Sequence, residues 1–307
     1  MAGRPGFTMQ VEALTIACLP VEILELVFHL LPPRDRRAAR GVSRWWREVA
    51  EVASLWTWVC FRLRRRGGEQ ELVKVMGSRR LEAAQGLEVR QVTEELLQAV
   101  IRHPGLRQLG LKDNDFTSIE IKQLVEALGK VEDVDLSFGS FTPHQVTVLF
   151  AALANGPASK LKKLNLKFLQ FSTDGFMQAS LPVEAEDVGL AVSRLEDADL
   201  SDLALTTLQA MAIFAILGGH RKVALRRLAM VGTNLSGVEP AVLARAVAGL
   251  KRCDLRQCCL TKEQVTTVLE ASLTSTSLHT LRLGGNPARG EEALLHRARL
   301  ALTYLEL

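Results

Sequence analysis

The sequence predicts an α/β protein in which a small unit of three helices precedes a solenoid of parallel strands and helices. Two observations lead to this prediction. A phrase of the form Leu-x-x-Leu-x-Leu recurs from about residue 81 to the end, and a regular recurrence of this kind is typical of repeat architectures. All four tryptophans fall between positions 45 and 58, ahead of the repeats. We therefore expect strands on the inner side of an arc and helices on its outer side.

The composition is that of a globular protein in a reducing compartment. Hydrophobic residues make up 48% of the 307 residues and charged residues 23%, and the net charge of +4 is too small to indicate general nucleic-acid binding. The five cysteines form no regular disulfide framework, and residues 1–10 lack the layout of a signal peptide. The longest later apolar run, residues 210–217, is too short to span a bilayer. We expect a cytoplasmic or nuclear protein, or both, with neither nucleic acid nor membrane among its partners.

Residues 19–56 carry more large apolar side chains than about 40 residues can bury alone, because so short a segment has too little interior. A first helix is expected over residues 20–31, and the Pro32-Pro33 pair ends it. Ser43 is placed to cap a third helix that carries Trp46. An apolar surplus rich in Trp on a small helical unit is typical of a surface that binds a partner.

This stretch resembles an F-box: Leu-Pro with Glu two residues later, Ile-Leu, an Arg-Asp turn, Val-x-x-x-Trp and a final Leu-Trp. The residues on that pattern are Leu19, Pro20, Glu22, Ile23, Leu24, Asp35, Val42, Arg44, Trp46, Leu55 and Trp56. Two positions depart from it. Ser43 stands where Cys is usual, which is a nearly isosteric change. Arg36 stands where Leu is common, and its charge near the start of the second helix argues against tight packing there.

The resemblance implies an F-box at residues 18–62, preceded by a flexible tail at residues 1–17. Residues 63–80 then form a basic linker with a short helix, and residues 81–307 form the repeats. An F-box implies a Skp-type adaptor as partner and, through it, a cullin scaffold and a RING subunit. The residues implied for the adaptor-binding face or its support are Leu19, Pro20, Ile23, Leu24, Val27, Val42, Trp46, Leu55 and Trp56.

The repeated phrase defines about eight units, the first degenerate and the last truncated, whose copies start 24 to 34 residues apart. The copies begin at Leu106, Val131, Leu161, Leu195, Leu225, Leu250, Leu278 and Leu302, after a degenerate unit near Leu81. In four units a Thr or Ser is followed three residues later by Glu or Gln, which is the spacing of a capping box at the start of a helix. These pairs are Thr117 with Glu120, Thr142 with Gln145, Ser236 with Glu239, and Thr261 with Gln264.

Units of strand, turn and helix resemble leucine-rich repeats of the ribonuclease-inhibitor type, which stack because one unit cannot bury its apolar face alone. An F-box followed by such repeats resembles the F-box/leucine-rich-repeat class of ubiquitin-ligase substrate receptors. One unit contains the acidic segment 180–187, which is expected to form a surface loop at the sheet edge. The segment is either a spacer or a loop that contacts a ligand.

No arrangement of residues indicates an enzyme, a metal site or a cofactor. The six histidines are scattered without metal-ligand spacing. Cys253 and Cys258 are better explained by the repeat, in which Cys253 replaces an inward Leu and Cys258 faces the backbone of the turn. Residues 284–287, Gly-Gly-Asn-Pro, form a turn of the repeat, because no Lys-Ser or Lys-Thr of a phosphate-binding loop follows them.

The inner face of the predicted sheet is strongly charged, and the sign alternates from strand to strand until the last two. This pattern is either a ladder of cross-strand ion pairs or a banded surface for a partner of complementary charge. The basic residues between positions 226 and 256 have no matching acidic strand after them, which favours an anion-attracting surface. Phe138 and Phe168, just past two strands, are either apolar anchors or tucked into the turn. The candidate substrate-binding residues are Phe138, Lys167, Phe168, Asp199, Asp202, Arg226, Arg227, Lys251, Arg252 and Arg256.

The leading hypothesis is a non-catalytic, substrate-recognition subunit of an SCF-type ubiquitin ligase. Its F-box would bind the adaptor, and its repeat arc would bind a protein substrate whose identity the sequence does not encode in a readable form. The alternative is a stoichiometric leucine-rich-repeat inhibitor or scaffold, whose F-box controls only its own turnover.

Overall fold

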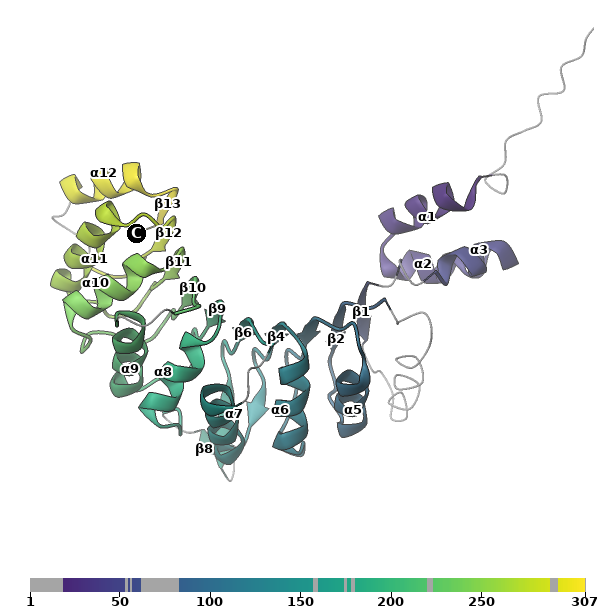
Figure 1. Ribbon diagram of the computed structural model, residues 1–307, viewed down its shortest axis with the longest axis horizontal. Coiled ribbons are helices and arrows are strands. Elements are labelled where there is room, and N and C mark those ends of the chain that lie inside the picture. The colour runs from purple at the N-terminus through teal and green to yellow at the C-terminus, as the bar shows by residue number, and fades with distance from the viewer. Residues whose placement is uncertain are drawn as a thin grey trace, which may run out of the picture.

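The computed structural model describes residues 19–52, 55, 57–61, 83–156, 160–173, 176–177, 180–219, 223–287 and 292–306. The tail expected at residues 1–17, the linker expected at residues 63–80, Trp56 and the start of the degenerate unit near Leu81 lie outside these ranges. Figure 1 shows an arc of strands and helices with a small helical unit at its N-terminal end.

The helical unit consists of α1 (Val21–Leu30), α2 (Pro33–Ala39) and α3 (Arg44–Ala50). The chain enters α1 at Pro20, and the Ser43 hydroxyl caps α3 by accepting a hydrogen bond from the Trp46 N–H at 3.0 Å, as predicted. Phe28 is fully buried and packs edge-to-face on Trp46, with ring centroids 5.4 Å apart. The other buried residues of this unit include Leu24, Ala39, Val49, Ala50 and Leu55.

Arg36 does not disturb this packing, contrary to the expectation from its charge. Its guanidinium donates hydrogen bonds to the carbonyl oxygens of Leu31 at 2.8 Å and His29 at 3.0 Å, and also to that of Leu55. Two of these acceptors lie at the end of α1, where unpaired carbonyls and the helix dipole favour a positive charge. Arg36 therefore ties α1, α2 and the segment after α3 together.

The arc contains one parallel sheet of ten strands in the order β1-β2-β3-β4-β6-β9-β10-β11-β12-β13. Its strands are β1 (Trp58–Phe61), β2 (Gly86–Val89), β3 (Gln108–Gly110), β4 (Asp133–Asp135), β6 (Lys163–Asn165), β9 (Asp197–Asp199), β10 (Arg227–Ala229), β11 (Arg252–Asp254), β12 (Thr280–Arg282) and β13 (Tyr304–Glu306). The sheet thus begins within residues 18–62, for which the sequence predicts helices only; the boundary between the two parts remains a prediction.

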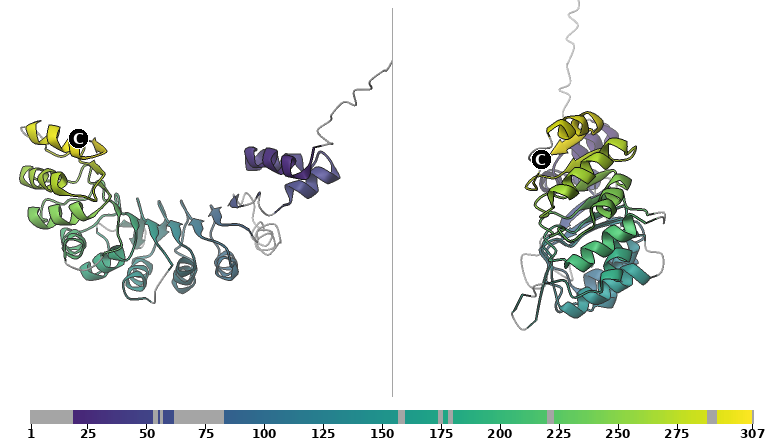
Figure 2. Two further views of the ribbon diagram at one scale, coloured as in Figure 1. Left: turned by 45° about the horizontal axis from the view of Figure 1, so that its top comes forward. Right: turned by 90° about the vertical axis from the view of Figure 1, so that its left-hand side faces the viewer.

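Helices cover the outer side of the sheet and leave the strands exposed along the inner side of the arc (Figures 1 and 2). They are α5 (Glu94–Arg102), α6 (Ile121–Lys130), α7 (Pro143–Asn155), α8 (Ala185–Ser193), α9 (Thr207–Leu217), α10 (Pro240–Gly249), α11 (Lys262–Thr274) and α12 (Glu292–Ala301). This arrangement confirms the predicted α/β solenoid with strands inside and helices outside.

One register runs through the whole sheet, and it places the middle residue of each three-residue strand toward the helices. Cys253 pairs with Leu228 on one side and Leu281 on the other, and all three are buried. The prediction that Cys253 replaces an inward Leu is confirmed. The residues on either side of the middle position point to the inner face, because side chains alternate along a strand.

Helix starts alternate between two forms along the arc. Helices α7, α9 and α11 begin with complete capping boxes at Thr142, Thr206 and Thr261. The Gln of each box is buried and donates to at least two carbonyl oxygens of the preceding repeat, as Gln145 does to Phe116 at 2.8 Å and to Ile119 at 2.9 Å. Helices α6, α8 and α10 instead have Glu at the N-cap and no side-chain cap. Two successive repeats therefore form one structural period.

The capping boxes predicted at Thr117 and Ser236 are wrong. The Asp115 carboxylate accepts hydrogen bonds from both the N–H and the hydroxyl of Thr117, at 3.0 and 2.7 Å, and α6 begins only at Ile121. Asn234 binds Ser236 in the same way, at 3.1 and 2.8 Å, before α10. In both cases a local side-chain turn uses the hydroxyl that a cap would need.

The acidic segment 180–187 is not a surface loop, so that expectation is wrong too. Leu181 is buried, and α8 begins at Ala185 with Glu186 and Asp187 in its first turn, where acidic side chains suit the helix dipole. The added length of this unit lies earlier, in an antiparallel pair formed by β7 (Gln170–Thr173) and β8 (Phe176–Met177). With β5 (Ser140–Phe141) they make a small second sheet.

Candidate functional site

The first candidate surface is the outward face of α1. Ile23, Leu26, Val27 and Leu30 follow one another at helical spacing and are 43, 60, 41 and 87% exposed. Val42, in the turn before α3, is 63% exposed. The four α1 residues make an apolar surface on a helix whose other side is already packed. We call these four residues the α1 face.

The structure distributes the predicted adaptor-binding residues over three environments. Pro20, Ile23, Val27 and Val42 are exposed, and Leu19 and Trp46 are half-buried. Leu24 and Leu55 are buried and can only support the surface from within; Trp56 lies outside the described residues. The prediction missed Leu26 and Leu30. The spacing of three, four and seven residues from Ile23 was the signal that could have found them.

The second candidate surface is the inner face of the sheet, where ion pairs join neighbouring strands. Lys162 pairs with Glu132 at 2.7 Å, Lys163 with Asp133 at 3.3 Å, and Arg227 with Asp197 at 3.3 Å. The hydrogen bond between Lys162 and Glu132 lowers the pKa of the Glu132 carboxyl and raises the pKa of Lys162. Burial raises the pKa of Asp197, and the Arg227 charge opposes this effect. The ladder interpretation is therefore confirmed for these strands.

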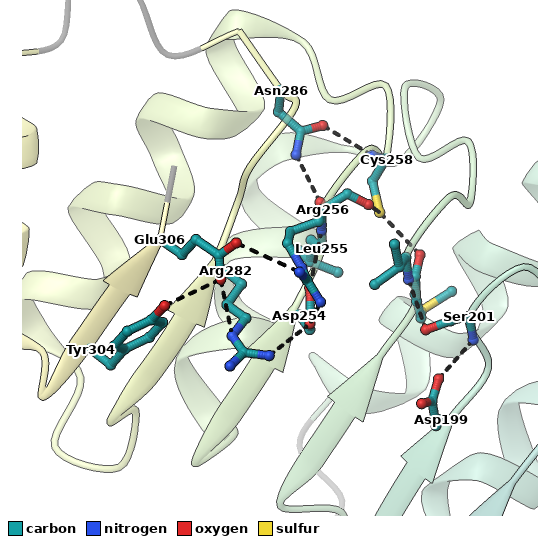
Figure 3. A network of polar contacts seen from close by, with 12 residues as sticks. Asp199, Ser201, Asp254, Leu255, Arg256, Cys258, Arg282, Asn286, Tyr304 and Glu306 are labelled. Atoms are coloured by element: carbon teal, nitrogen blue, oxygen red, sulfur yellow. Dashed lines mark hydrogen bonds and ion pairs between the residues drawn. The ribbon is translucent and has the colours of Figure 1, made fainter. Parts of the chain in front are cut away.

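The C-terminal end of the inner face is less basic than the sequence suggests. Arg256 binds Asp254 of its own repeat at 2.8 Å and lies 3.6 Å from Glu306 on the last strand. Arg282 bridges the same two carboxylates, at 3.4 Å to Asp254 and 3.2 Å to Glu306. Figure 3 shows these charges gathered in one network. The expectation that residues 226–256 have no acidic partner after them is wrong, because Glu306 supplies one.

Four of the predicted cations take part in no ion pair within the described ranges. Arg226, Lys251 and Arg252 are exposed, and Lys167 is half-buried. A hollow of about 330 Å³ lies beside them on the inner face. Its lining includes Lys167, Asp199, Arg227, Arg252 and Arg256. The geometry thus brings these five predicted substrate-binding residues to one concave place.

Phe138 and Phe168 occupy a turn position that recurs throughout the arc. The third residue after a strand adopts positive φ in seven successive repeats: Asp113, Phe138, Phe168, Asp202, Gly232, Gln257 and Gly285. Gly, Asn and Asp tolerate this conformation, whereas it is unfavourable by roughly 1–2 kcal/mol for a bulky residue. Both Phe rings remain more than one-third exposed, so they are not tucked into the turn.

Two cysteines, Cys253 and Cys258, are buried and have structural positions. The Cys258 thiol lies 3.1 Å from the Met230 carbonyl oxygen in the turn, and burial raises its pKa to about 12. Burial also raises the pKa of Cys253. Neither thiol is therefore prepared to act as a thiolate. Within the described ranges, no cluster of His, Cys, Asp or Glu has the geometry of a metal site. No helix in the described part has both the length and the apolar character needed to cross a membrane.

Comparisons with known proteins identify one part of the chain. No curated protein matches this sequence. Among solved structures, the crystal structure of a protein from Bacteroides fragilis is similar at 16% sequence identity and a TM-score of 0.41, with 81% of this chain and 73% of that chain covered. Residues 16–62 match the model of the F-box-like family, and this interval contains α1, α2 and α3. An F-box-like domain therefore lies at the N-terminus of this chain.

Proposed function

We propose that this chain is the substrate-recognition subunit of an SCF-type ubiquitin ligase. In this proposal the α1 face binds a Skp-type adaptor, which links the chain to a cullin scaffold and a RING subunit. The repeats, which resemble leucine-rich repeats, hold a substrate protein on their inner face. The chain itself performs no chemistry, and it acts in the cytoplasm, the nucleus or both.

The observation that carries this proposal is the coincidence of the F-box-like match with the α1 face. Exposed aliphatic side chains in a continuous row are unfavourable in water, and their burial by a partner contributes about 25 cal/mol per Å² of apolar area removed from solvent. The buried residues Leu24, Phe28 and Leu55 belong to the core of this unit and support the row from within. The row is thus suited to an apolar contact with a second protein.

The arc supports the second half of the proposal through its shape and polarity. Its inner face is concave, bears charges of both signs and follows one unbroken register from β1 to β13. A surface of this kind selects a partner by complementary charge and shape. Holding a substrate there would place its lysines near a ubiquitin-charged enzyme. Ubiquitin transfer would then not depend on an encounter between two dilute molecules.

The adaptor contact can be tested with a surface variant that leaves the core intact. The triple change Ile23→Glu, Leu26→Glu and Leu30→Glu should abolish capture of a purified Skp-type adaptor. The matched control is Leu208→Glu with Met211→Glu on α9, two residues that are 69 and 41% exposed on the outer side of the arc. Adaptor capture that is unchanged in the triple variant, with circular dichroism showing both variants folded, would disprove the α1-face contact.

Proteasome inhibition separates a receptor from a stoichiometric inhibitor or scaffold. If the chain is a receptor, a second protein that binds the arc should accumulate when the proteasome is inhibited. When the triple variant replaces the natural chain, the level of that protein should no longer respond to the inhibitor. If the F-box-like domain controls only its own turnover, the chain alone should accumulate. That second result would contradict the receptor proposal.

A further inference from the structure

Two phenylalanines form an exposed aromatic pair on the ridge where the strands end. The ring centroids of Phe138 and Phe168 lie 4.9 Å apart at an interplanar angle of 31°, and the residues are 36 and 38% exposed. A second pair in the same part of the arc, Phe116 and Phe141, is stacked at 4.4 Å and fully buried. The Phe138–Phe168 pair belongs neither to the hydrophobic core that includes this second pair nor to the partly buried residues packed against it.

The backbone makes this pair unusual as well. At the equivalent turn of other repeats the residue is Asp113, Asp202, Gly232, Gln257 or Gly285. Among the described residues, only the two adjacent repeats after β4 and β6 place a large aromatic ring in this left-handed conformation. Unfavourable backbone geometry that the surroundings maintain is concentrated at binding and catalytic sites in proteins. Two such positions side by side therefore indicate a contact surface.

Two lysines complete the surface. The Nζ of Lys112 lies 4.9 Å from the centre of the Phe138 ring, and that of Lys167 lies 5.1 Å from the centre of the Phe168 ring. Neither lysine takes part in an ion pair among the described residues, in contrast to Lys162 and Lys163 at the start of β6. Both ammonium groups are available to carboxylates of a partner that covers the rings.

We propose that Lys112, Phe138, Lys167 and Phe168 form the docking point for an acidic peptide segment with one large apolar side chain. The inference rests on the proposed function, since it specifies which kind of substrate segment the arc binds. The apolar side chain would cover the exposed ring edges while flanking carboxylates meet the two ammonium groups.

The aromatic part is tested by replacing both rings with the residue that other repeats use. The full chain carrying Phe138→Gly and Phe168→Gly should melt at an equal or higher temperature, because Gly accepts positive φ without strain. The probe is a fluorescent peptide, Glu-Glu-Phe-Glu-Glu, and its affinity should fall by about tenfold or more in this variant. Undiminished binding of the peptide to a folded Gly variant would overturn the proposal.

The charge part is tested with Lys112→Glu and Lys167→Glu, which should also weaken binding of the acidic peptide by about tenfold or more. The matched control is Lys122→Glu with Lys130→Glu, two exposed lysines of α6 on the outer side, which should leave the affinity unchanged. Peptides with Lys in place of Glu, or Ala in place of Phe, should bind the natural chain at least about tenfold more weakly. Equal binding of these peptides, or tighter binding of oligouridylate at the same ridge, would contradict the assignment.

Adaptor capture distinguishes this inference from the proposed function. The Gly variant should bind a Skp-type adaptor as well as the natural chain does, because the α1 face is unchanged. If the Gly variant binds both the peptide and the adaptor as well as the natural chain does, the docking point alone is overturned. Failure of the natural chain to bind the adaptor, with ridge-dependent peptide binding intact, would overturn the ligase role and leave the docking point standing.

Discussion

The helical unit and the arc bury their apolar residues to very different extents. Within the described residues, twelve large hydrophobic residues are exposed, and six of them lie between residues 21 and 42. In the arc, a repeat between two others has a neighbour on each side that covers its apolar residues. Within the described part of the chain, no second layer covers the three short helices, so α1 buries Leu24 and Phe28 and leaves its other apolar residues exposed.

This difference explains why the two candidate surfaces have opposite chemistry. The α1 face is apolar because the unit is too small to have an inside for every large side chain. The inner face of the arc is charged because its stability comes from the other side of the sheet, where the strands meet the helices. The inner positions are therefore free to vary, and ion pairs such as Asp133 with Lys163 occupy several of them.

The largest expected effect would come from emptying the core of the helical unit. Phe28→Ala should destabilise that unit by about 3–5 kcal/mol, because a fully buried ring and its contact with Trp46 are lost from a small core. Hydrogen exchange measured by fragment should show amides of residues 19–52 losing protection, while those of β3 to β12 keep theirs.

The matched change in the arc is Phe150→Ala in α7, whose ring is equally buried. It should lower protection in the repeats next to α7 and leave α1 unaffected, because each repeat contacts its neighbours only. A loss of protection throughout the chain after Phe28→Ala would contradict the comparison and show that the two parts unfold together.

A smaller effect is expected from Arg36, which belongs to the helical unit alone. Arg36→Met should destabilise the unit by about 2–3 kcal/mol, because carbonyl oxygens of His29, Leu31 and Leu55 lose a charged donor. Arg44→Met is the control: its side chain is 93% exposed and, among the described residues, pairs with Glu48 alone, so the change should stay within about 0.5 kcal/mol. Equal effects of the two changes in urea unfolding would contradict this role of Arg36.

The sequence predicted the arc better than its helix starts. A recurring Leu phrase reports burial directly, since the same positions of every repeat must face the helices. The capping spacing reports only one of several bonds that a hydroxyl can make. Thr142 and Thr261 cap their helices, whereas Thr117 and Ser236 bind Asp115 and Asn234 instead. A competing acceptor two residues earlier decides between the two outcomes.

The candidate surfaces were predictable where they depend on local spacing and unpredictable where they depend on distant partners. Ile23 and Val27 were found from their spacing in a helix and from the F-box resemblance. The pairing of Arg256 with Glu306 was not found, because it joins repeats whose separation in space follows only from the curvature of the arc. The left-handed turn at Phe138 and Phe168 was also missed, because Phe does not mark that conformation as Gly or Asp does.

Removing the hydroxyl of a capping residue should distinguish the two kinds of helix start by about 1 kcal/mol in the free energy of unfolding. Thr261→Ala should destabilise the arc by roughly that amount, because the first turn of α11 loses its side-chain acceptor. Thr117→Ala should change the free energy of unfolding by less than about 0.5 kcal/mol, since α6 has no side-chain cap to lose. Urea unfolding of the two variants checks the difference, and equal losses would show that Thr117 stabilises α6 after all.

The smallest effects concern two carboxyl groups of the ion-pair ladder, which should respond to pH in opposite ways. The pKa of Glu132 is lowered in the folded chain, so its contribution is present above the unfolded pKa and is lost as the pH falls through the folded pKa. The pKa of Asp197 is raised by burial, so the folded state favours its protonated form, and that contribution is lost as the pH rises through the folded pKa.

Carboxyl carbon resonances followed by NMR should therefore titrate below the ordinary value for Glu132 and above it for Asp197. Lys162→Met should move the midpoint of Glu132 upward toward the ordinary value, because the hydrogen bond and the positive charge of Lys162 are what lower it. Arg227→Met should move the midpoint of Asp197 further upward, because the change removes a cation that opposes the effect of burial. A midpoint of Asp197 at or below the ordinary value in the natural chain would mean that burial does not dominate at this position. The inner face would then be as open to solvent at β9 as it is at β4, and the hollow beside Asp197 would be too wet to hold a partner by charge alone.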